Sequence, residues 1–171
     1  MFYGRKAEMR KLNEMYASSN FEFAAIYGRR RIGKTTLIRE FIKDKNSLFF
    51  VANESTAQDN LISLSRCIGG GLSAPVFRDY ESALSFVFDK ARAERLVFVI
   101  DEFPYLAGAY QGISSLLQIL TDQNKDTTKL MLILCGSSMS FMENQVLGYQ
   151  SPLYGRRTAQ FKILPFSFFE A

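Results

Sequence analysis

The chain has 171 residues, 47% of them hydrophobic, which is enough to fill the core of one compact domain. Its 21 lysines and arginines exceed its 17 aspartates and glutamates, and the resulting net charge of +4 suits an anionic ligand but is too small to argue for nucleic acid by itself. The absence of histidine excludes histidine-based metal sites and histidine general bases.

The two cysteines, Cys67 and Cys135, are far apart and form no C-x-x-C pair, so we expect reduced core thiols rather than a disulfide or a metal site. The N-terminus lacks the apolar segment of a signal peptide, and the longest apolar runs, near residues 96–100 and 130–135, are too short to cross a bilayer. These features predict a cytoplasmic protein with no membrane partner.

The first predicted elements are a helix over residues 7–18 and an apolar, aromatic-rich strand over residues 21–27. The strand leads into Gly28-Arg29-Arg30-Arg31-Ile32-Gly33-Lys34-Thr35, the pattern G-x-x-x-x-G-K-[ST] of a phosphate-binding loop. A helix predicted over residues 34–43 follows, so the strand-loop-helix context that such a loop needs is present.

The loop pattern carries specific chemistry. Its glycines let the backbone wrap a phosphate chain, with the amides at the start of the next helix pointing inward as donors. Lys34 is expected to reach the β and γ phosphates, and the Thr35 hydroxyl to bind Mg²⁺. Arg29 and Arg30 are expected to be partly solvated, as is Arg31, with the option that one of the three contacts phosphate. The expected nucleotide-binding residues of this region are Gly28, Arg31, Ile32, Gly33, Lys34, Thr35 and Thr36.

The next elements are a strand predicted over residues 47–52 and two helices. Ser55 and Gln58 have the spacing of a capping box that opens the first helix, and a run of glycines from Gly69 ends it. Apolar residues at helical spacing over residues 84–91 mark the second helix.

A fully apolar run over residues 96–100 predicts a strand buried on both faces, and it leads directly into Asp101 and Glu102. A hydrophobic strand ending in an acidic pair is typical of a Walker B element. Asp101 is expected to hold Mg²⁺ through water, opposite Thr35, and Glu102 to act as the catalytic base that polarises the attacking water. The alternative is that Asp101 caps a helix and Glu102 is a solvated charge.

A helix predicted over residues 113–120 precedes an apolar strand over residues 130–135, which ends in Gly136, Ser137 and Ser138. Small hydroxyl residues at this place are candidates to sense the γ-phosphate or to hold the attacking water. The alternative is that they only cap the short helix near Met139.

Arg156 and Arg157 precede the last predicted strand, residues 161–164. An arginine near a developing phosphoryl charge acts as a finger, either from the same chain or from a neighbouring subunit, so both residues are catalytic candidates. The alternative is that the pair is solvated surface.

The alternation of strands and helices predicts an α/β fold, a three-layer α/β/α sandwich with a five-stranded parallel sheet. Ligands bind such sheets at the carboxyl ends of the strands, where the loop and the acidic pair are both expected to lie.

With these motifs in hand, the chain resembles the AAA+-related P-loop ATPases, and within them the archaeal-type ATPase family also found in bacteria. The similarity spans nearly the whole chain, and its motifs follow in chain order. Phe2-Tyr3-Gly4-Arg5-Lys6-Ala7-Glu8 is similar to the N-terminal G-R-x-x-E box, residues 28–35 to Walker A, residues 100–105 to Walker B, residues 136–138 to sensor 1, and residues 151–158 to the arginine-finger region. The resemblance implies that Tyr3, Gly4 and Arg5 pack against adenine, that Ser137 acts as sensor 1, and that Asn53 restrains the catalytic glutamate.

The resemblance also implies Mg²⁺-dependent binding and hydrolysis of ATP by a regulatory switch that drives attached domains. The lid with its sensor 2 arginine, and the winged-helix and nuclease-like domains of the family, would lie beyond Ala171, so residues 1–171 are interpreted as a P-loop ATPase core of the AAA+ type. The expected partners are ATP and ADP, together with DNA through such C-terminal domains. A homo-oligomer is left open.

Three other functions compete with an ATPase. A GTPase would need N-K-x-D, which Asn124-Lys125-Asp126 imitates, but Thr127 stands at the position where the Asp is required. A small-molecule kinase would use Arg156 and Arg157 as lid arginines. A nucleotide- or DNA-binding module would show little activity alone, because an isolated core lacks arginines supplied by neighbours.

Overall fold

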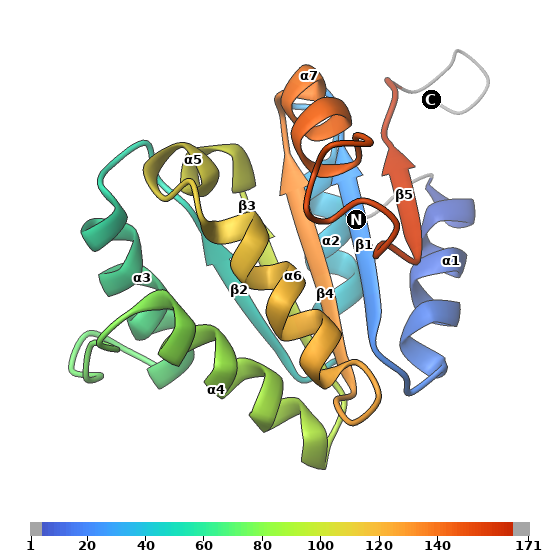
Figure 1. Cartoon of the computed structure of the whole chain (residues 1–171). Helices are drawn as coiled ribbons and strands as arrows, with labels where there is room; N and C mark the ends of the chain where they lie inside the picture. Colours follow the sequence, from blue (N-terminus) through green and yellow to red (C-terminus); the bar gives the residue numbers. More distant parts are fainter. Residues whose placement is uncertain (1–4, 166–171) are drawn as a thin grey trace.

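Five parallel strands form one sheet in the order β2-β3-β4-β1-β5 (Figure 1). The computed structural model describes residues 5–165. The strands are β1 (Glu22–Tyr27), β2 (Ser47–Val51), β3 (Leu96–Asp101), β4 (Leu130–Gly136) and β5 (Ala159–Lys162). The helices are α1 (Lys6–Ala17), α2 (Lys34–Ile42), α3 (Ala57–Gly69), α4 (Tyr80–Ala93), α5 (Phe103–Ala109), α6 (Ile113–Asn124), α7 (Met139–Phe141) and η1 (Met142–Val146), the last a π-helical turn.

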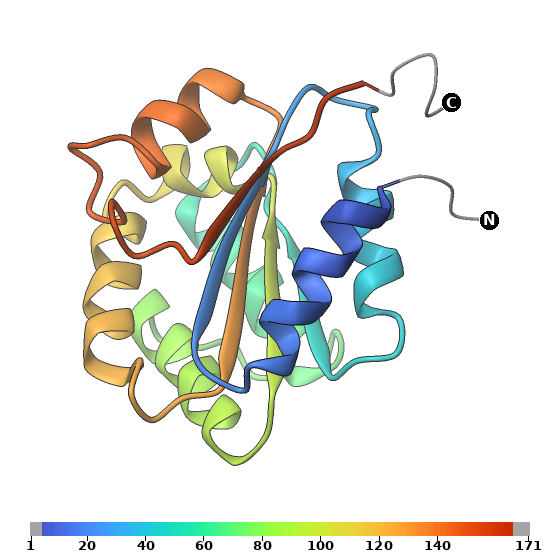
Figure 2. The same cartoon turned by 90° about the vertical axis from the view of Figure 1, so that its right-hand side faces the viewer.

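Helices cover both faces of the sheet, so the predicted three-layer α/β/α sandwich is confirmed. Side chains of β1 alternate between the faces, with Phe23 and Ala25 in one apolar cluster and Ala24 and Ile26 in the other. Helices α3 to α6 pack on the first face, and α1 and α2 on the second, as Figure 2 shows from the side. Of the three inner strands, β3 and β4 are buried at every residue, which explains why both are continuous apolar runs in the sequence.

The position of the last strand differs from the prediction. Residues 161–164 are the more apolar run, yet β5 is Ala159–Lys162, because these are the residues that pair in register with Ala24 to Tyr27 of β1. A strand needs a hydrogen-bonding neighbour as well as an apolar pattern, and β1 ends at Tyr27.

The start of α3 also differs by one residue from the predicted capping box. Thr56 is the N-cap, and its hydroxyl oxygen accepts a hydrogen bond from the Asp59 amide at 3.0 Å. Ser55 instead donates to the Asp59 carboxylate at 2.5 Å. Both hydroxyls can reach this turn, and the extended backbone of Thr56 places it in the capping position. The helix ends at Gly70 in a left-handed conformation, as the glycine run predicts.

Helix α5 is the element that the sequence pattern does not reveal. It has only seven residues and includes Gly108, which weakens a helical pattern, whereas Pro104 stands in the first turn, where proline is tolerated. Its buried residues Phe103 and Leu106 hold it against the end of the sheet.

Cys67 and Cys135 are free thiols, the first half-buried and the second buried. Within residues 5–165, none of the helices combines the length and the apolar character that crossing a bilayer requires.

Candidate functional site

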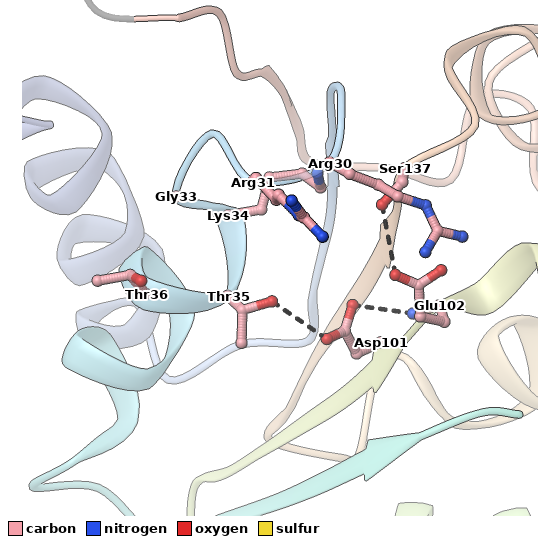
Figure 3. Close-up of a pocket in the computed structure, with 9 residues that line it drawn as sticks. All are labelled: Arg30, Arg31, Gly33, Lys34, Thr35, Thr36, Asp101, Glu102 and Ser137. Carbon is pink, nitrogen blue, oxygen red and sulfur yellow. Dashed lines mark hydrogen bonds between the residues drawn. The ribbon is translucent and has the colours of Figure 1, made fainter.

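A cavity of about 330 Å³ lies at the carboxyl ends of β1, β3 and β4, where the topology of a parallel sheet places a ligand site. The residues that line it are Arg30, Arg31, Gly33, Lys34, Thr35, Thr36, Asp101, Glu102 and Ser137 (Figure 3). The loop after β1 therefore faces the ends of β3 and β4 across one space, although these segments are far apart in the sequence.

The loop backbone has two positions that require glycine. A Cβ atom at Gly28 would lie 2.3 Å from the carbonyl oxygen of Ile163, so the loop passes β5 too closely for any side chain. Gly33 has a φ of 96°, and α2 starts at the next residue with no side-chain cap. The uncapped amides of the first turn of α2 and its positive dipole end are thus available to an anion in the cavity.

Lys34 is buried, with 6% of its surface exposed. Its Nζ donates a hydrogen bond of 2.5 Å to the carbonyl oxygen of Arg29, within the loop itself. Burial lowers the pKa of this ammonium group, while the carboxylates of Glu102 and Asp101 oppose the shift. A charged group held this way by a single carbonyl can exchange that partner for phosphate.

Thr35 and Asp101 meet across the cavity. The Thr35 hydroxyl donates to Asp101 Oδ2 at 3.3 Å, and Asp101 Oδ1 accepts from the Glu102 amide at 2.8 Å. Asp101 is 6% exposed, and the N-cap of α5 is Glu102, so the interpretation of Asp101 as a helix cap is wrong. A hydroxyl and a carboxylate at this separation are the oxygen donors that Mg²⁺ prefers.

Beneath Asp101 lies Cys135, the last core residue of β4. Its pKa stands well above the ordinary thiol value, because burial and the Asp101 carboxylate both disfavour the thiolate. The Cys135 thiol beneath the site is therefore uncharged. Within residues 5–165, no three acidic or cysteine side chains gather as a metal site.

Glu102 is half-buried and has a left-handed backbone, with φ 55° and ψ 41°. This conformation costs a non-glycine residue about 1–2 kcal/mol. It turns the chain sharply from β3 into α5, and the Glu102 carboxylate then accepts a hydrogen bond of 3.3 Å from the Ser137 hydroxyl. Strain of this kind at a side chain that lines a cavity points to a functional constraint.

The sequence leaves open whether the serines after β4 face the ligand or cap a helix, and the two serines differ in this respect. Ser137 lines the cavity and contacts Glu102. Ser138 is the N-cap of α7 and accepts from the Phe141 amide at 3.4 Å. One residue therefore has the position of a sensor, and its neighbour has the structural role.

The arginine candidates separate in the same way. Arg30 and Arg31 line the cavity, whereas Arg156 and Arg157 do not. Arg156 binds the Asp122 carboxylate through Nε and Nη2, at 3.0 and 2.9 Å, on the α6 side of the molecule. The structure therefore does not bring Arg156 to the cavity of its own chain.

The remaining predicted binding residues support the loop from the side that faces away from the cavity. Ile32 packs into the core under α1 and α2, and Gly28 fits against β5, so neither lines the cavity. Arg5 joins these parts, because its guanidinium donates to the carbonyl oxygen of Ile32 at 3.3 Å and to that of Leu164. Tyr3 and Gly4 lie outside the described residues, and packing of this segment on adenine stays a prediction.

Asn53 is exposed and outside the cavity lining, and its backbone amide and carbonyl are hydrogen-bonded to the Asn60 side chain at 2.9 and 3.1 Å. The candidate guanine-reading residue Asn124 is buried at the end of α6, where the chain returns toward the start of β4. Its side chain accepts from Arg92 at 2.7 Å and donates to Leu120 at 2.8 Å. Asn124 lies at the amino-terminal edge of the sheet, opposite the cavity, which removes the support for a GTPase.

Tyr105 is the site residue that sequence reasoning misses. Its hydroxyl accepts a hydrogen bond of 2.6 Å from Arg30 Nη2, which connects the loop to α5. The signal in the sequence is weak, because Tyr105 lies in the short, proline-containing helix after Glu102.

Residues 2–171 match the model of a family described as an ATPase domain predominantly from Archaea. The uncharacterized protein MJECL04 of Methanocaldococcus jannaschii is 39% identical over 170 residues, which are 98% of this chain and 37% of that protein. The chain therefore spans little more than a third of the length of this relative.

Two solved structures have a similar fold. The Walker-type ATPase PABY2304 of Pyrococcus abyssi matches with a TM-score of 0.71 and 21% identity, over 99% of this chain and 55% of that one. Cdc6p of Pyrobaculum aerophilum matches with a TM-score of 0.65 and 15% identity, over 95% and 46% of the two chains.

Proposed function

The chain belongs to the family of ATPase domains found predominantly in Archaea, and from this premise we propose that its cavity binds ATP with Mg²⁺ and hydrolyses it. The carrying observation is that Lys34, Thr35, Asp101 and Glu102 all line one cavity, with Thr35 and Asp101 3.3 Å apart. A fold alone does not establish a reaction, whereas these side chains are the ones that phosphoryl transfer requires.

Binding depends on the loop. Lys34 exchanges the carbonyl oxygen of Arg29 for the β and γ phosphates, and the amides at the start of α2 hold the same oxygens. Thr35 and, through water, Asp101 hold Mg²⁺, which neutralises part of the phosphate charge when it is bound. We also propose that Tyr3, Gly4 and Arg5 pack against the adenine ring of the bound nucleotide.

Hydrolysis depends on Glu102. Its carboxylate is the base that orients and deprotonates the attacking water, since no histidine is present in the chain. Ser137, bonded to Glu102 at 3.3 Å, keeps the carboxylate turned toward the cavity and is placed to contact the terminal phosphate.

The wider role is part of the same proposal. Because the chain covers only a small part of its relative, a regulatory switch that drives further domains, and contact with DNA through those domains, are proposals about a longer protein. A cytoplasmic location is also proposed. Arg156 is bound to Asp122 away from the cavity, so a finger role for Arg156 requires the nucleotide of a second copy in a homo-oligomer, and Arg157, which does not line the cavity, stays the second finger candidate.

That same geometry favours a second candidate, a nucleotide-binding module that hydrolyses little ATP as a single chain. Phosphate release that rises more than in proportion to protein concentration separates an oligomeric ATPase from such a module, because only the former needs residues supplied in trans.

The test compares Glu102→Gln with the parent chain. The variant keeps its affinity for ATP and Mg²⁺ in calorimetry, while phosphate release falls by a factor of about 100 or more, as expected for a lost general base. Glu14→Gln, which removes an exposed carboxylate from α1, is the matched control and keeps the parent rate. Equal rates for Glu102→Gln and the parent would refute the base assignment, and no binding of ATP by the parent would refute the proposal as a whole.

A further inference from the structure

Arg30 reaches out of the phosphate-binding loop and bridges to α5. Its side chain is exposed and lines the cavity, and Nη2 donates to the Tyr105 hydroxyl at 2.6 Å. Figure 3 shows it reaching from the loop toward Glu102, on the Ser137 side of the cavity. The bridge therefore lies where the loop and the acidic strand end face each other.

The partner of Arg30 is weak for a guanidinium group. In residues 5–165, the phenol of Tyr105 is its one hydrogen-bonded neighbour, and the nearby carboxylates of Glu102 and Glu54 act on it through charge alone. A guanidinium has five N–H donors, so most of them are left for another acceptor. A phosphate oxygen carries charge and is therefore a stronger partner than a neutral hydroxyl.

The position of Arg30 indicates which phosphate of the ligand it would contact. Lys34 and the start of α2 form the loop end of the cavity, and Glu102 forms the opposite end. A water activated by Glu102 attacks the terminal phosphate in line, so that phosphate must lie between the loop and Glu102. Arg30 spans this same interval.

We propose that Arg30 binds the terminal phosphate of ATP and that Tyr105 competes for the same guanidinium when no triphosphate is bound. The inference rests on the proposed function. The exchange has two consequences: the cavity distinguishes ATP from ADP, and the arrival of the γ-phosphate releases α5, the helix that starts at Glu102, from the loop.

The experiment measures the affinities for ADP and for the non-hydrolysable β,γ-imido analogue of ATP by calorimetry with Mg²⁺. Arg30→Met is expected to weaken the triphosphate analogue by about tenfold or more and ADP by less than about threefold. Arg10→Met is the matched control, because Arg10 is exposed on α1 and does not line the cavity, and it leaves both affinities within about twofold. Arg30→Lys keeps the charge and retains part of the preference for the triphosphate.

Tyr105→Phe distinguishes competition from support. Removing the hydroxyl frees Arg30, so the triphosphate analogue binds about two to five times more tightly, and this gain disappears in the Arg30→Met background. Weaker triphosphate binding by Tyr105→Phe means that Tyr105 orients Arg30 for the ligand, which overturns the competition.

The failures can be told apart. A parent chain that binds no nucleotide removes the proposed function, and this inference with it. A parent that binds ATP through Lys34, but in which Arg30→Met leaves the ratio of triphosphate to ADP affinity unchanged, overturns this inference alone.

Discussion

The phosphate-binding loop, residues 28–35, and the segment before β5, residues 151–158, are both irregular and both carry arginines. Arg30 in the loop is exposed and, among the described residues 5–165, has one hydrogen-bonded partner, the neutral Tyr105 hydroxyl at 2.6 Å. Arg156 in the segment binds both oxygens of the Asp122 carboxylate and the carbonyl oxygens of Pro152 and Tyr154. Two arginines that look alike in the sequence therefore differ in how easily they can change partners.

The two regions also differ in how fully their backbone hydrogen-bonding groups have partners. Thr158 ties the segment to the start of β1, because its amide donates to the Phe23 carbonyl at 2.7 Å and its hydroxyl accepts from the Phe23 amide at 2.6 Å. Leu153 anchors the segment in the core. The loop instead leaves the first turn of α2 without a side-chain cap. A region that supports the fold has its polar groups satisfied, whereas a binding region keeps groups with weak partners for its ligand.

The largest expected difference between the regions is in nucleotide affinity. Lys34→Met preserves most of the buried side-chain volume but removes the ammonium group, so the affinity for ATP falls by a factor of about 100 to 1,000, or roughly 3–4 kcal/mol. Arg156→Met removes a charge from the segment and leaves the ATP affinity of the chain within about twofold. Calorimetric titration of both variants checks the comparison, and equal losses would show that the segment takes part in binding.

A smaller difference concerns the glycines of the two regions, both with positive φ. Gly28→Ala places a methyl group against the backbone of Ile163 and lowers the free energy of unfolding by about 2 kcal/mol. Gly155 has a φ of 78° with open space around it, so Gly155→Ala costs only about 1 kcal/mol of backbone strain. Urea unfolding monitored by circular dichroism measures both values. A larger loss of unfolding free energy for Gly155→Ala than for Gly28→Ala would contradict the conclusion that Gly28 is the more tightly packed position.

The smallest expected effect is the pH dependence of the Arg156–Asp122 pair. The hydrogen bond from Arg156 lowers the pKa of Asp122, so the pair contributes stability above the ordinary carboxyl value of 3.8 and loses it as the pH falls through the lowered folded value. Both side chains are partly exposed, at 29% and 43%, so Asp122→Asn lowers the free energy of unfolding by less than about 1 kcal/mol at pH 7.

This difference between Asp122→Asn and the parent chain disappears as Asp122 becomes protonated in acid. Urea unfolding at pH 7 and at about pH 2.5 tests the sign, with the exposed Asp126→Asn as the control. A difference that grows in acid would contradict the role of the ionised carboxylate.

Prediction from sequence succeeds where the determining interactions are local. Gly28, Gly33 and Lys34 follow a strand and open a helix, and the backbone geometry of that transition needs only neighbouring residues. The strand ending in Asp101 and Glu102 is equally readable, because complete burial makes β3 continuously apolar. Both features lie where they were expected.

Prediction fails where a distant partner decides. β5 is shifted toward the residues that pair with β1, and α5 is held by the core despite its short length and its glycine. The contact of Arg156 with Asp122 on α6 also has no signature in the sequence. The Arg30–Tyr105 bridge joins residues 75 positions apart and has no signature in either segment.

The amino-acid pattern is sufficient for the order of the five strands and of the helices other than α5 and η1, for the glycine-rich loop and for the acidic strand end, because these depend on burial and on conformational preferences within a few neighbouring residues. The identity of the hydroxyl that contacts Glu102 and of the arginines that line the cavity follows from the three-dimensional fold. Those choices depend on which chain segments meet at the end of the sheet, and hydrogen bonds of 2.6 to 3.3 Å form only between groups that the whole fold has brought together.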